Sequence, residues 1–266
     1  MRTLALTVAY DGTDFAGMQW QPTAPTIQGA LEAALTTVLQ HELRVVAAGR
    51  TDAGVHALAQ VVSLQTPNPI PVERVPRALN LLLPESIRIR RVVERPAGFH
   101  ARRSACYRRY WYRLQVTRHP DPLRGRFCWQ LDRELDLPAM QAALARLEGR
   151  HDFAAFCHGG ETKGTRRTVH HARVAARRNG IVVDVQADAF LHRMVRLLVS
   201  NVVAVGAGER PVCWLEELLC SQDRYLAGKG APPNGLTLMR IGYPPMETPL
   251  IGDSGEFNDD DEMLSG

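Results

Sequence analysis

Apolar residues recur along the chain with two different periods, and each period predicts one kind of element. Residues 2–10 alternate apolar and polar positions, with Leu4, Leu6 and Val8 on one face, which is typical of a β-strand. After Thr26 the spacing changes to three or four residues. The positions that follow this spacing are Ile27, Leu31, Leu35 and Val38. This pattern predicts an amphipathic helix that the hydroxyl of Thr26 caps.

The same patterns continue to residue 243. Further strands are predicted at 44–48, 61–65, 87–93, 106–116, 168–176, 181–187 and 236–243. Further helices are predicted at 72–83 (interrupted early by Pro76), 138–147, 191–205 (ended by Gly206) and 214–220. A two-residue turn signal, Asn179-Gly180, separates the strands that flank it. Strands and helices are mixed in both halves, so we expect an α+β protein with two similar halves around a mixed, largely antiparallel sheet.

Charge is distributed unevenly along the chain. The formal net charge is +4, but residues 246–266 hold seven acids and no lysine or arginine, so the first 245 residues alone carry +11. A body this basic favours a polyanionic partner such as nucleic acid, although solubility alone also accounts for it. We expect an N-terminal half at 1–104, a C-terminal half at 105–245 and a disordered acidic tail at 246–266.

Composition narrows the class of protein. Apolar residues make up 45% and charged residues 23%, as in soluble globular proteins, and no apolar run is long enough to cross a bilayer. The N-terminus lacks the pattern of a signal peptide, so we expect a cytoplasmic protein. Five scattered cysteines without a Cys-x-x-Cys pair argue against a disulfide framework and against a zinc site. We therefore expect no zinc site.

The sharpest chemical signal is the stretch Gly-Arg-Thr-Asp-Ala-Gly-Val-His-Ala at 49–57. Thr51 and Asp52 are common turn and cap residues, so an ordinary tight turn is one interpretation. The other is a carboxylate held beside the guanidinium of Arg50. An ionised, oriented carboxylate can attack an electrophilic carbon as a nucleophile. His56 could act as a general base or only as a structural residue.

This stretch, followed by Gln60-Val61, resembles the catalytic motif of the TruA family of tRNA pseudouridine synthases. Eight more segments resemble that family in the family's own order. They lie at 10–19, 26–32, 99–102, 108–112, 151–153, 167–169, 190–196 and 231–236. The chain departs from the family pattern at Ala187-Asp188 and at Lys229-Gly230, and the tail after Pro245 lies outside the resemblance.

The resemblance implies the pseudouridine synthase fold with a central cleft, and it implies particular site residues. The family's catalytic aspartate falls on Asp52, its active-site arginine on Arg196 and its base-packing tyrosine on Tyr110. The other substrate-binding residues expected within the resembling segments are Arg50, Arg102, Arg108 and Leu236.

Two of these assignments also have an interpretation from the residues alone. If 107–114 is a strand, Arg108 and Tyr110 share one face, and interleaved arginines and aromatics suit phosphate contact and base stacking. A core strand whose aromatics simply pack is the alternative. Arg196 is predicted on the polar side of the helix at 191–205, together with His192 and Arg193, where a solvated face is the plainer interpretation.

Members of the family isomerise uridine to pseudouridine at positions 38, 39 and 40 of the tRNA anticodon stem-loop and act as homodimers. The resemblance thus implies an isomerase whose partner is tRNA. Because an isomerisation oxidises nothing and transfers nothing in, we expect it to need no cofactor and no metal. The sequence leaves open whether Asp52 attacks the sugar or the base, and which group removes the C5 proton. A non-catalytic tRNA-binding protein or chaperone, and a hydrolase of the same glycosidic bond, are the rival interpretations.

Overall fold

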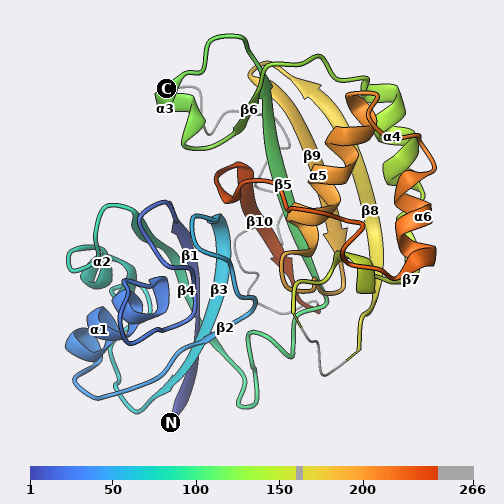
Figure 1. Cartoon of the computed structure of the whole chain (residues 1–266). Coiled ribbons are helices and arrows are strands. Elements are labelled where there is room, and N and C mark those ends of the chain that lie inside the picture. The colour runs from blue at the N-terminus through green and yellow to red at the C-terminus, as the bar shows by residue number, and fades with distance from the viewer. Residues whose placement is uncertain (160–163, 245–266) are drawn as a thin grey trace. The chain divides into compact units, whose positions relative to one another are not determined.

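The computed structural model describes residues 1–159 and 164–244, and packing divides them into two compact units (Figure 1). Among the described residues, the first unit holds Met1–Cys106 and 237–244, and the second holds Tyr107–Leu236. Boundaries at 104 and 245 stay predictions, because this division follows packing and does not show which segment folds by itself. The acidic tail expected at 246–266 lies outside the described residues.

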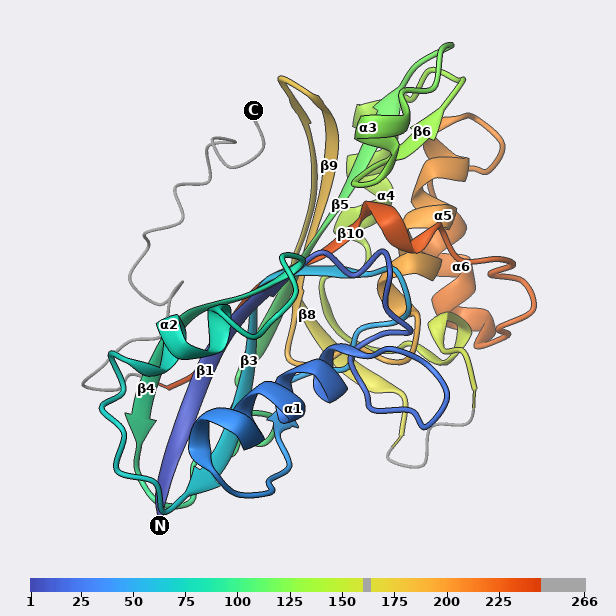
Figure 2. The ribbon, with the colours of Figure 1, turned by 90° about the vertical axis from the view of Figure 1, so that its left-hand side faces the viewer.

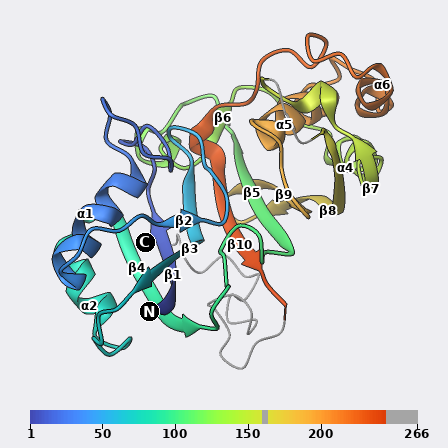
Figure 3. The same ribbon diagram turned by 90° about the horizontal axis from the view of Figure 1, so that it is seen from below.

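A mixed sheet forms the centre of the first unit. Its strands run in the order β4 (Ile87–Arg95), β1 (Arg2–Tyr10), β3 (His56–Thr66) and β10 (Leu236–Gly242), and the short strand β2 (Val46–Ala47) also pairs with β3. All pairs are antiparallel except β3 with β10. Helices α1 (Ile27–Leu39) and α2 (Val75–Asn80) lie on one side of these strands (Figure 3).

Strand β1 is buried on both faces, which the alternation of its residues does not predict. Leu4, Leu6 and Val8 are inaccessible to solvent, but so are Ala5 and Thr7, which point the other way. A strand between two neighbours, covered on both faces, loses the simple in–out pattern.

The second unit contains five further described strands. Strands β5 (Tyr107–Val116), β9 (Gly180–Ala187), β8 (Arg166–Arg177) and β7 (Gly149–Asp152) are antiparallel in that order, and β6 (Trp129–Leu131) pairs with β5 in parallel. Three helices cover one face of these strands: α4 (Leu137–Ala145), α5 (Met194–Gly206) and α6 (Trp214–Ser221) (Figure 2). Shorter elements are α3 (Pro122–Gly125) and the 3₁₀ turns η1 (Ala154–Phe156) and η2 (Pro233–Gly235). The predicted α+β class is confirmed.

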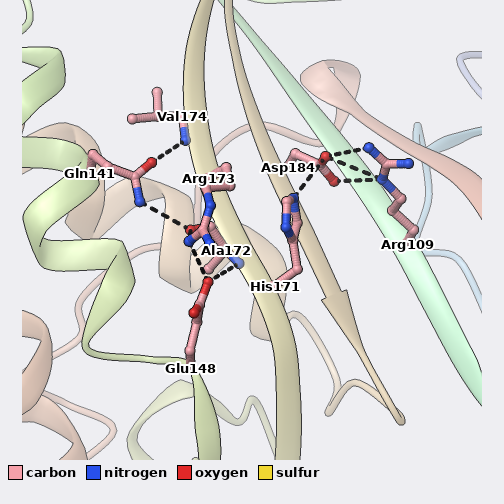
Figure 4. A network of polar contacts seen from close by, with 8 residues as sticks. All are labelled: Arg109, Gln141, Glu148, His171, Ala172, Arg173, Val174 and Asp184. Atoms are coloured by element: carbon pink, nitrogen blue, oxygen red, sulfur yellow. Dashed lines mark hydrogen bonds and ion pairs between the residues drawn. The ribbon is translucent and has the colours of Figure 1, made fainter. Parts of the chain in front are cut away.

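Beyond the end of its short neighbour β7, strand β8 has no partner strand on that side among the described residues, and side chains bind its backbone N–H and C=O groups there instead (Figure 4). Gln141 of α4 accepts a hydrogen bond from the backbone N–H of Val174 at 2.9 Å and donates one to the carbonyl of Ala172 at 3.3 Å. The carboxylate of Glu148 accepts from the N–H of Ala172 at 3.0 Å and pairs with the guanidinium of Arg173. An edge whose donors and acceptors are occupied is a poor template for another strand.

The hairpin between β8 and β9 has a different turn from the one predicted. Arg177 pairs with Gly180, so the two turn residues are Arg178 and Asn179, and neither has a positive φ. Gly180 is already the first residue of β9, with φ at +135°. A Cβ there would lie 2.3 Å from the carbonyl oxygen of Leu114, so close strand packing, more than the turn, requires glycine.

Several boundaries also differ from the predictions. The helix expected at 191–205 begins only at Met194, and Gly206 is its last residue and not its stop signal. Pro76 lies in the first turn of α2 and starts that helix instead of interrupting it, because proline has no N–H to lose there. The sequence patterns gave no sign of α3, β6 or β7, which have three or four residues each.

Candidate active site

The loop that carries Asp52 connects β2 to β3 and is anchored by its neighbour in sequence, Thr51. Thr51 is buried, Asp52 is half-buried, and Arg50 and Ala53 are exposed. Thr51 Oγ1 shares a hydrogen bond of 2.8 Å with the hydroxyl of Tyr10, at the end of β1. The loop thus fixes its backbone through Thr51 and leaves the next side chain partly accessible.

A second polar side chain completes this anchor. Gln60 of β3 is fully buried, and its Nε2 donates to the carbonyl of Gly49 at 2.9 Å and to the Tyr10 hydroxyl at 3.4 Å. Burial raises the pKa of Tyr10 to about 12, although its hydrogen bonds to Thr51 and Gln60 oppose the rise. The phenol is therefore neutral at physiological pH, and uncharged groups hold the loop.

Residues 11–18 pack directly against the Asp52 loop. The N–H of Met18 donates to the carbonyl of Thr51 at 3.0 Å, and the N–H of Gly54 donates to the carbonyl of Phe15 at 3.4 Å. Gly17 has φ at +99°, and a Cβ there would lie 2.7 Å from the carbonyl oxygen of Thr51. These contacts give a physical reason why the segments at 10–19 and 49–57 occur together.

His56 fixes the end of the loop. It is the first residue of β3, it is 4% exposed, and its Nδ1 accepts a hydrogen bond of 3.1 Å from the N–H of Gly12. The same nitrogen lies 3.1 Å from the carboxylate of Asp11. Gly12 itself packs closely on the loop, because a Cβ there would lie 2.0 Å from the carbonyl oxygen of Val55. These contacts favour the structural interpretation of His56.

Arg196 lies in the second unit, in the first turn of α5. Its Nε donates to the carbonyl of Ala231 at 2.7 Å, and the N–H of Ala231 donates to the carbonyl of Arg196 at 2.9 Å. A Cβ on Gly230 would lie 3.3 Å from the Cβ of Arg196, so the segment before η2 runs tightly along this turn. Arg196 is half-buried, and the solvated face expected for it is wrong.

The two residues expected beside Arg196 are exposed, as a solvated position implies, but their expected place on the helix is wrong. His192 and Arg193 precede α5 and are not on a helical face. Ten of the thirteen residues of α5 are buried, so this helix has almost no polar side. The apolar stripe used for the prediction covers only part of a helix that is packed nearly all round.

Tyr110 and Arg108 lie on β5 and face the packed side of its sheet. Their register partners on β9 are Val185 and Ala187, and both of these are inaccessible to solvent. The Tyr110 ring contacts Phe190 edge to face at 5.2 Å, and Arg108 donates to the carbonyl of Asp188 at 2.7 Å. In this structure Tyr110 is only 7% exposed, so its proposed contact with a base requires the ring to become accessible.

On the opposite face of β5, the arginine side chains bind other side chains of the protein. Arg109 binds both oxygens of Asp184, at 2.7–3.1 Å, and His171 approaches the same carboxylate at 3.1 Å (Figure 4). The guanidinium groups of Arg109 and Arg113 both lie over the ring of Trp111. The interleaved arginines and aromatics of this face therefore already have partners inside the protein.

The structure distributes the predicted site residues over the two units. Asp52, Arg50 and Arg102 belong to the first unit, and Tyr110, Arg108, Arg196 and Leu236 belong to the second. Arg102 is exposed in the turn after β4, and Leu236 is a buried residue at the start of β10. Sequence reasoning missed Tyr10 and Gln60 as anchors of the loop, although both lie in or beside segments that it had singled out.

The family model for tRNA pseudouridine synthase, PseudoU_synth_1, matches residues 6–102 and 143–244. The chain belongs to this family. "tRNA pseudouridine synthase A" of Chloroflexus aurantiacus is 45% identical over 250 residues, which cover 92% of this chain and 90% of the relative. The protein of the same name from Moorella thermoacetica is 44% identical over 248 residues, covering 91% of this chain and all of the relative.

Family membership confirms the expected recognition, the pseudouridine synthase fold and the enzyme class: this is an isomerase. A solved complex of Cbf5, Nop10 and Gar1 is also similar, with a TM-score of 0.37 and 12% identity over 89% of this chain and 49% of that one. That likeness is too weak to support a conclusion. The matched ranges of the pseudouridine synthase family include Asp52 and Arg196, while Arg108 and Tyr110 fall in the interval between them.

Two further properties concern the part of the chain that the structure describes. Within it, no group of three or more His, Cys, Asp or Glu side chains is arranged to hold a metal ion. None of its helices is long and apolar enough to cross a membrane.

Proposed function

We propose that this pseudouridine synthase acts on tRNA, at uridines 38, 39 and 40 of the anticodon stem-loop, with Asp52 as its nucleophile. Its family and the names of its relatives support tRNA as the substrate. One observation supports Asp52 above all. The buried Thr51, Tyr10 and Gln60 fix the backbone of the loop while the adjacent carboxylate stays partly accessible. Catalytic groups need such fixed orientation.

The target uridine must leave its stack before any side chain can reach its glycosidic bond. Asp52 then promotes cleavage of the bond between N1 and C1′, the uracil turns, and C5 bonds to C1′. The C5 proton leaves and N1 takes up a proton, so the reaction is balanced without an oxidant, a reductant or water. In this proposal Arg196 orients the carboxylate, because a guanidinium can bind it with two parallel hydrogen bonds.

The substrate-binding roles of Tyr110, Arg50, Arg102, Arg108 and Leu236 are part of the same proposal. Tyr110 would stack on the displaced base, and the arginines would bind phosphates. Leu236 would contribute an apolar contact. We also propose that the enzyme is cytoplasmic and forms a homodimer, as the family resemblance implies. Sedimentation of the full chain tests the homodimer.

The deciding experiment compares wild type with Asp52→Asn on an unmodified tRNA transcript. Pseudouridine is mapped by chemical labelling and primer extension, and binding is measured in parallel. We expect wild type to modify the anticodon arm. Asp52→Asn keeps the shape of the side chain without its charge, so it should bind the tRNA normally and lose roughly 10⁴-fold or more in rate.

The rival functions give different products. A tRNA-binding protein or chaperone would bind the transcript and change no uridine. A glycosidic hydrolase would release free uracil and leave an abasic site. Modification by Asp52→Asn at the wild-type rate would refute the nucleophile, and modification outside the anticodon arm would refute the positions.

A further inference from the structure

We infer that the residues around the start of α5 form a second RNA-binding site, in which Arg193 binds a backbone phosphate and Tyr225 stacks on a base. We call His158, Arg193, Arg224 and Tyr225 the α5 patch. The inference rests on the proposed function, since it takes the RNA substrate as the partner. All four residues belong to the second unit.

His158 brings the two arginines of the patch together. Its Nδ1 makes a short contact with Nη2 of Arg224, and its Nε2 lies 3.4 Å from Nη1 of Arg193. The backbone and ring of His192 hold this histidine in place: the N–H of His158 donates to the His192 carbonyl at 3.0 Å, and Nδ1 of His192 binds the His158 carbonyl at 2.6 Å. The backbone of His158 is thus anchored, and its imidazole lies between the two guanidinium groups.

The hydrogen-bonding capacity of that imidazole cannot serve both arginines. A neutral imidazole has one accepting nitrogen and one N–H, and guanidinium groups only donate. The tautomer decides which arginine that nitrogen serves, and we assign it to the closer partner, Arg224. Arg193 then faces an N–H, so its donors are directed at a group that cannot accept them. An exposed guanidinium in this situation is well suited to a phosphate oxygen.

The backbone at Arg193 supports the same conclusion. Arg193 precedes the first residue of α5 and has φ at +60°, one of three non-glycine residues with positive φ among those described. Glycine or asparagine suits this conformation better, so the backbone gives no reason for arginine. The N-terminal end of α5 adds the partial positive charge of the helix dipole, which favours an anion beside Arg193.

Tyr225 supplies an aromatic surface next to these charges. Its side chain is 87% exposed, although it follows Arg224 directly. The loop around it is nevertheless held: the N–H of Tyr225 donates to Asp223 Oδ1 at 2.8 Å, and the carbonyl of Ala227 accepts from Asn201 of α5 at 3.0 Å. An exposed ring on a fixed backbone loses little conformational freedom when a base stacks on it.

The same loop leads into the segment that holds Arg196. Ala231, which exchanges two hydrogen bonds with Arg196, lies six residues after Tyr225. RNA bound to the α5 patch would therefore lie near the proposed catalytic arginine. Basic side chains combined with an accessible aromatic ring are typical of proteins that bind unpaired nucleotides.

The test measures the affinity for an unmodified tRNA transcript at several salt concentrations. Arg193→Gln should weaken binding and lower the slope of log affinity against log salt by about 1, because one phosphate contact is lost. Arg193→Lys keeps the charge and should keep the slope. Tyr225→Ala should weaken binding roughly 5- to 100-fold with an unchanged slope, and Tyr225→Phe should bind like wild type.

Two controls match these variants. Arg133 is an exposed arginine of the same unit that already pairs with Glu209, so Arg133→Gln should leave affinity and slope unchanged. Leu123 is 83% exposed in the same unit, so Leu123→Ala should also bind normally. The inference is overturned if Arg193→Gln and Tyr225→Ala bind with wild-type affinity and slope. Stacking is overturned if Tyr225→Phe binds as weakly as Tyr225→Ala.

Pseudouridine formation by wild type, measured on the same transcript, separates the two proposals. If wild type forms pseudouridine and the variants of the α5 patch bind normally, only this inference fails. If those variants weaken binding as expected but wild type changes no uridine, the proposed function fails and the RNA site stands.

Discussion

The Asp52 loop and the start of α5 hold their functional side chains by different means. Neutral groups from two strands and a neighbouring loop anchor the backbone next to Asp52. Arg196 is instead bound through its own Nε to the carbonyl of Ala231. In the first region the fold positions the backbone of a reactive residue; in the second the side chain is itself part of the fold.

The difference predicts that substitutions act differently in the two regions. At Asp52, chemistry and stability should separate, because the carboxylate can be changed while its anchors remain. At Arg196, every substitution disturbs a structural hydrogen bond as well as the proposed contact with the carboxylate. Four experiments examine this contrast, and they are given from the largest expected effect to the smallest.

Arg196→Lys should reduce the rate of pseudouridine formation by about 10²- to 10³-fold, the usual cost of removing one oriented donor from an active site. Lysine keeps the charge but has no fork of donors that could bind Ala231 and a carboxylate together. Single-turnover kinetics and thermal unfolding measure the two effects. Arg146→Lys, an exposed pair with Glu216 on the same unit, is the control. An active Arg196→Lys enzyme would show that charge alone suffices.

Gly17→Ala should cost about 10²-fold in rate, because a misplacement of about 1 Å in a catalytic group can do so. Its Cβ would meet the carbonyl of Thr51, next to Asp52. Gly98→Ala is a matched control: φ is +94°, close to the +99° of Gly17, but no atom lies within 4 Å of its Cβ. Both variants should lose similar stability from the backbone conformation. Equal losses of rate would contradict the packing argument.

Tyr10→Phe should lower the rate a few-fold and the free energy of unfolding by about 1 kcal/mol, since the short buried hydrogen bond to Thr51 and the longer one from Gln60 are lost. Tyr243→Phe loses a comparable bond, from the hydroxyl to the carbonyl of Ala101 at 2.8 Å in the same unit. It should lose similar stability and keep its rate. The ratio of kcat to KM for each variant, with denaturant unfolding, decides whether Tyr10 positions the loop or only stabilises the unit.

The stability of the protein at alkaline pH tests whether the Tyr10 hydroxyl that anchors the Asp52 loop is neutral. Burial raises the pKa of Tyr10 to about 12 in the folded protein, against 10.0 for an exposed tyrosine. Its stabilising effect should therefore be complete below pH 10 and decline as pH rises from 10 to 12. The unfolding free energy of wild type minus that of Tyr10→Phe should fall by about 1.4 kcal/mol per pH unit in this range and change sign within it. A constant difference would mean that the phenol ionises normally when folded.

The α+β class, most elements and the segments that bear chemistry were readable from the sequence, because they depend on local period and on motif. Thr26 caps α1 as predicted, with its hydroxyl accepting from Gly29, and the strand at 2–10 has the predicted bounds. Residues close in sequence determine such features. The sequence also singled out Asp52 and its loop, since the motif is contiguous.

Tertiary structure decided what depends on residues far apart in the chain. The late start of α5 follows from the left-handed Arg193, and its burial on nearly all sides follows from packing that a hydrophobic stripe cannot reveal. Tyr10, Gly12, Gly17 and Gln60 hold the Asp52 loop from two separate segments, and Ala231 holds Arg196 across 35 residues. Periodicity shows which face of an element is apolar, but only folding determines which distant donors and carbonyl groups meet.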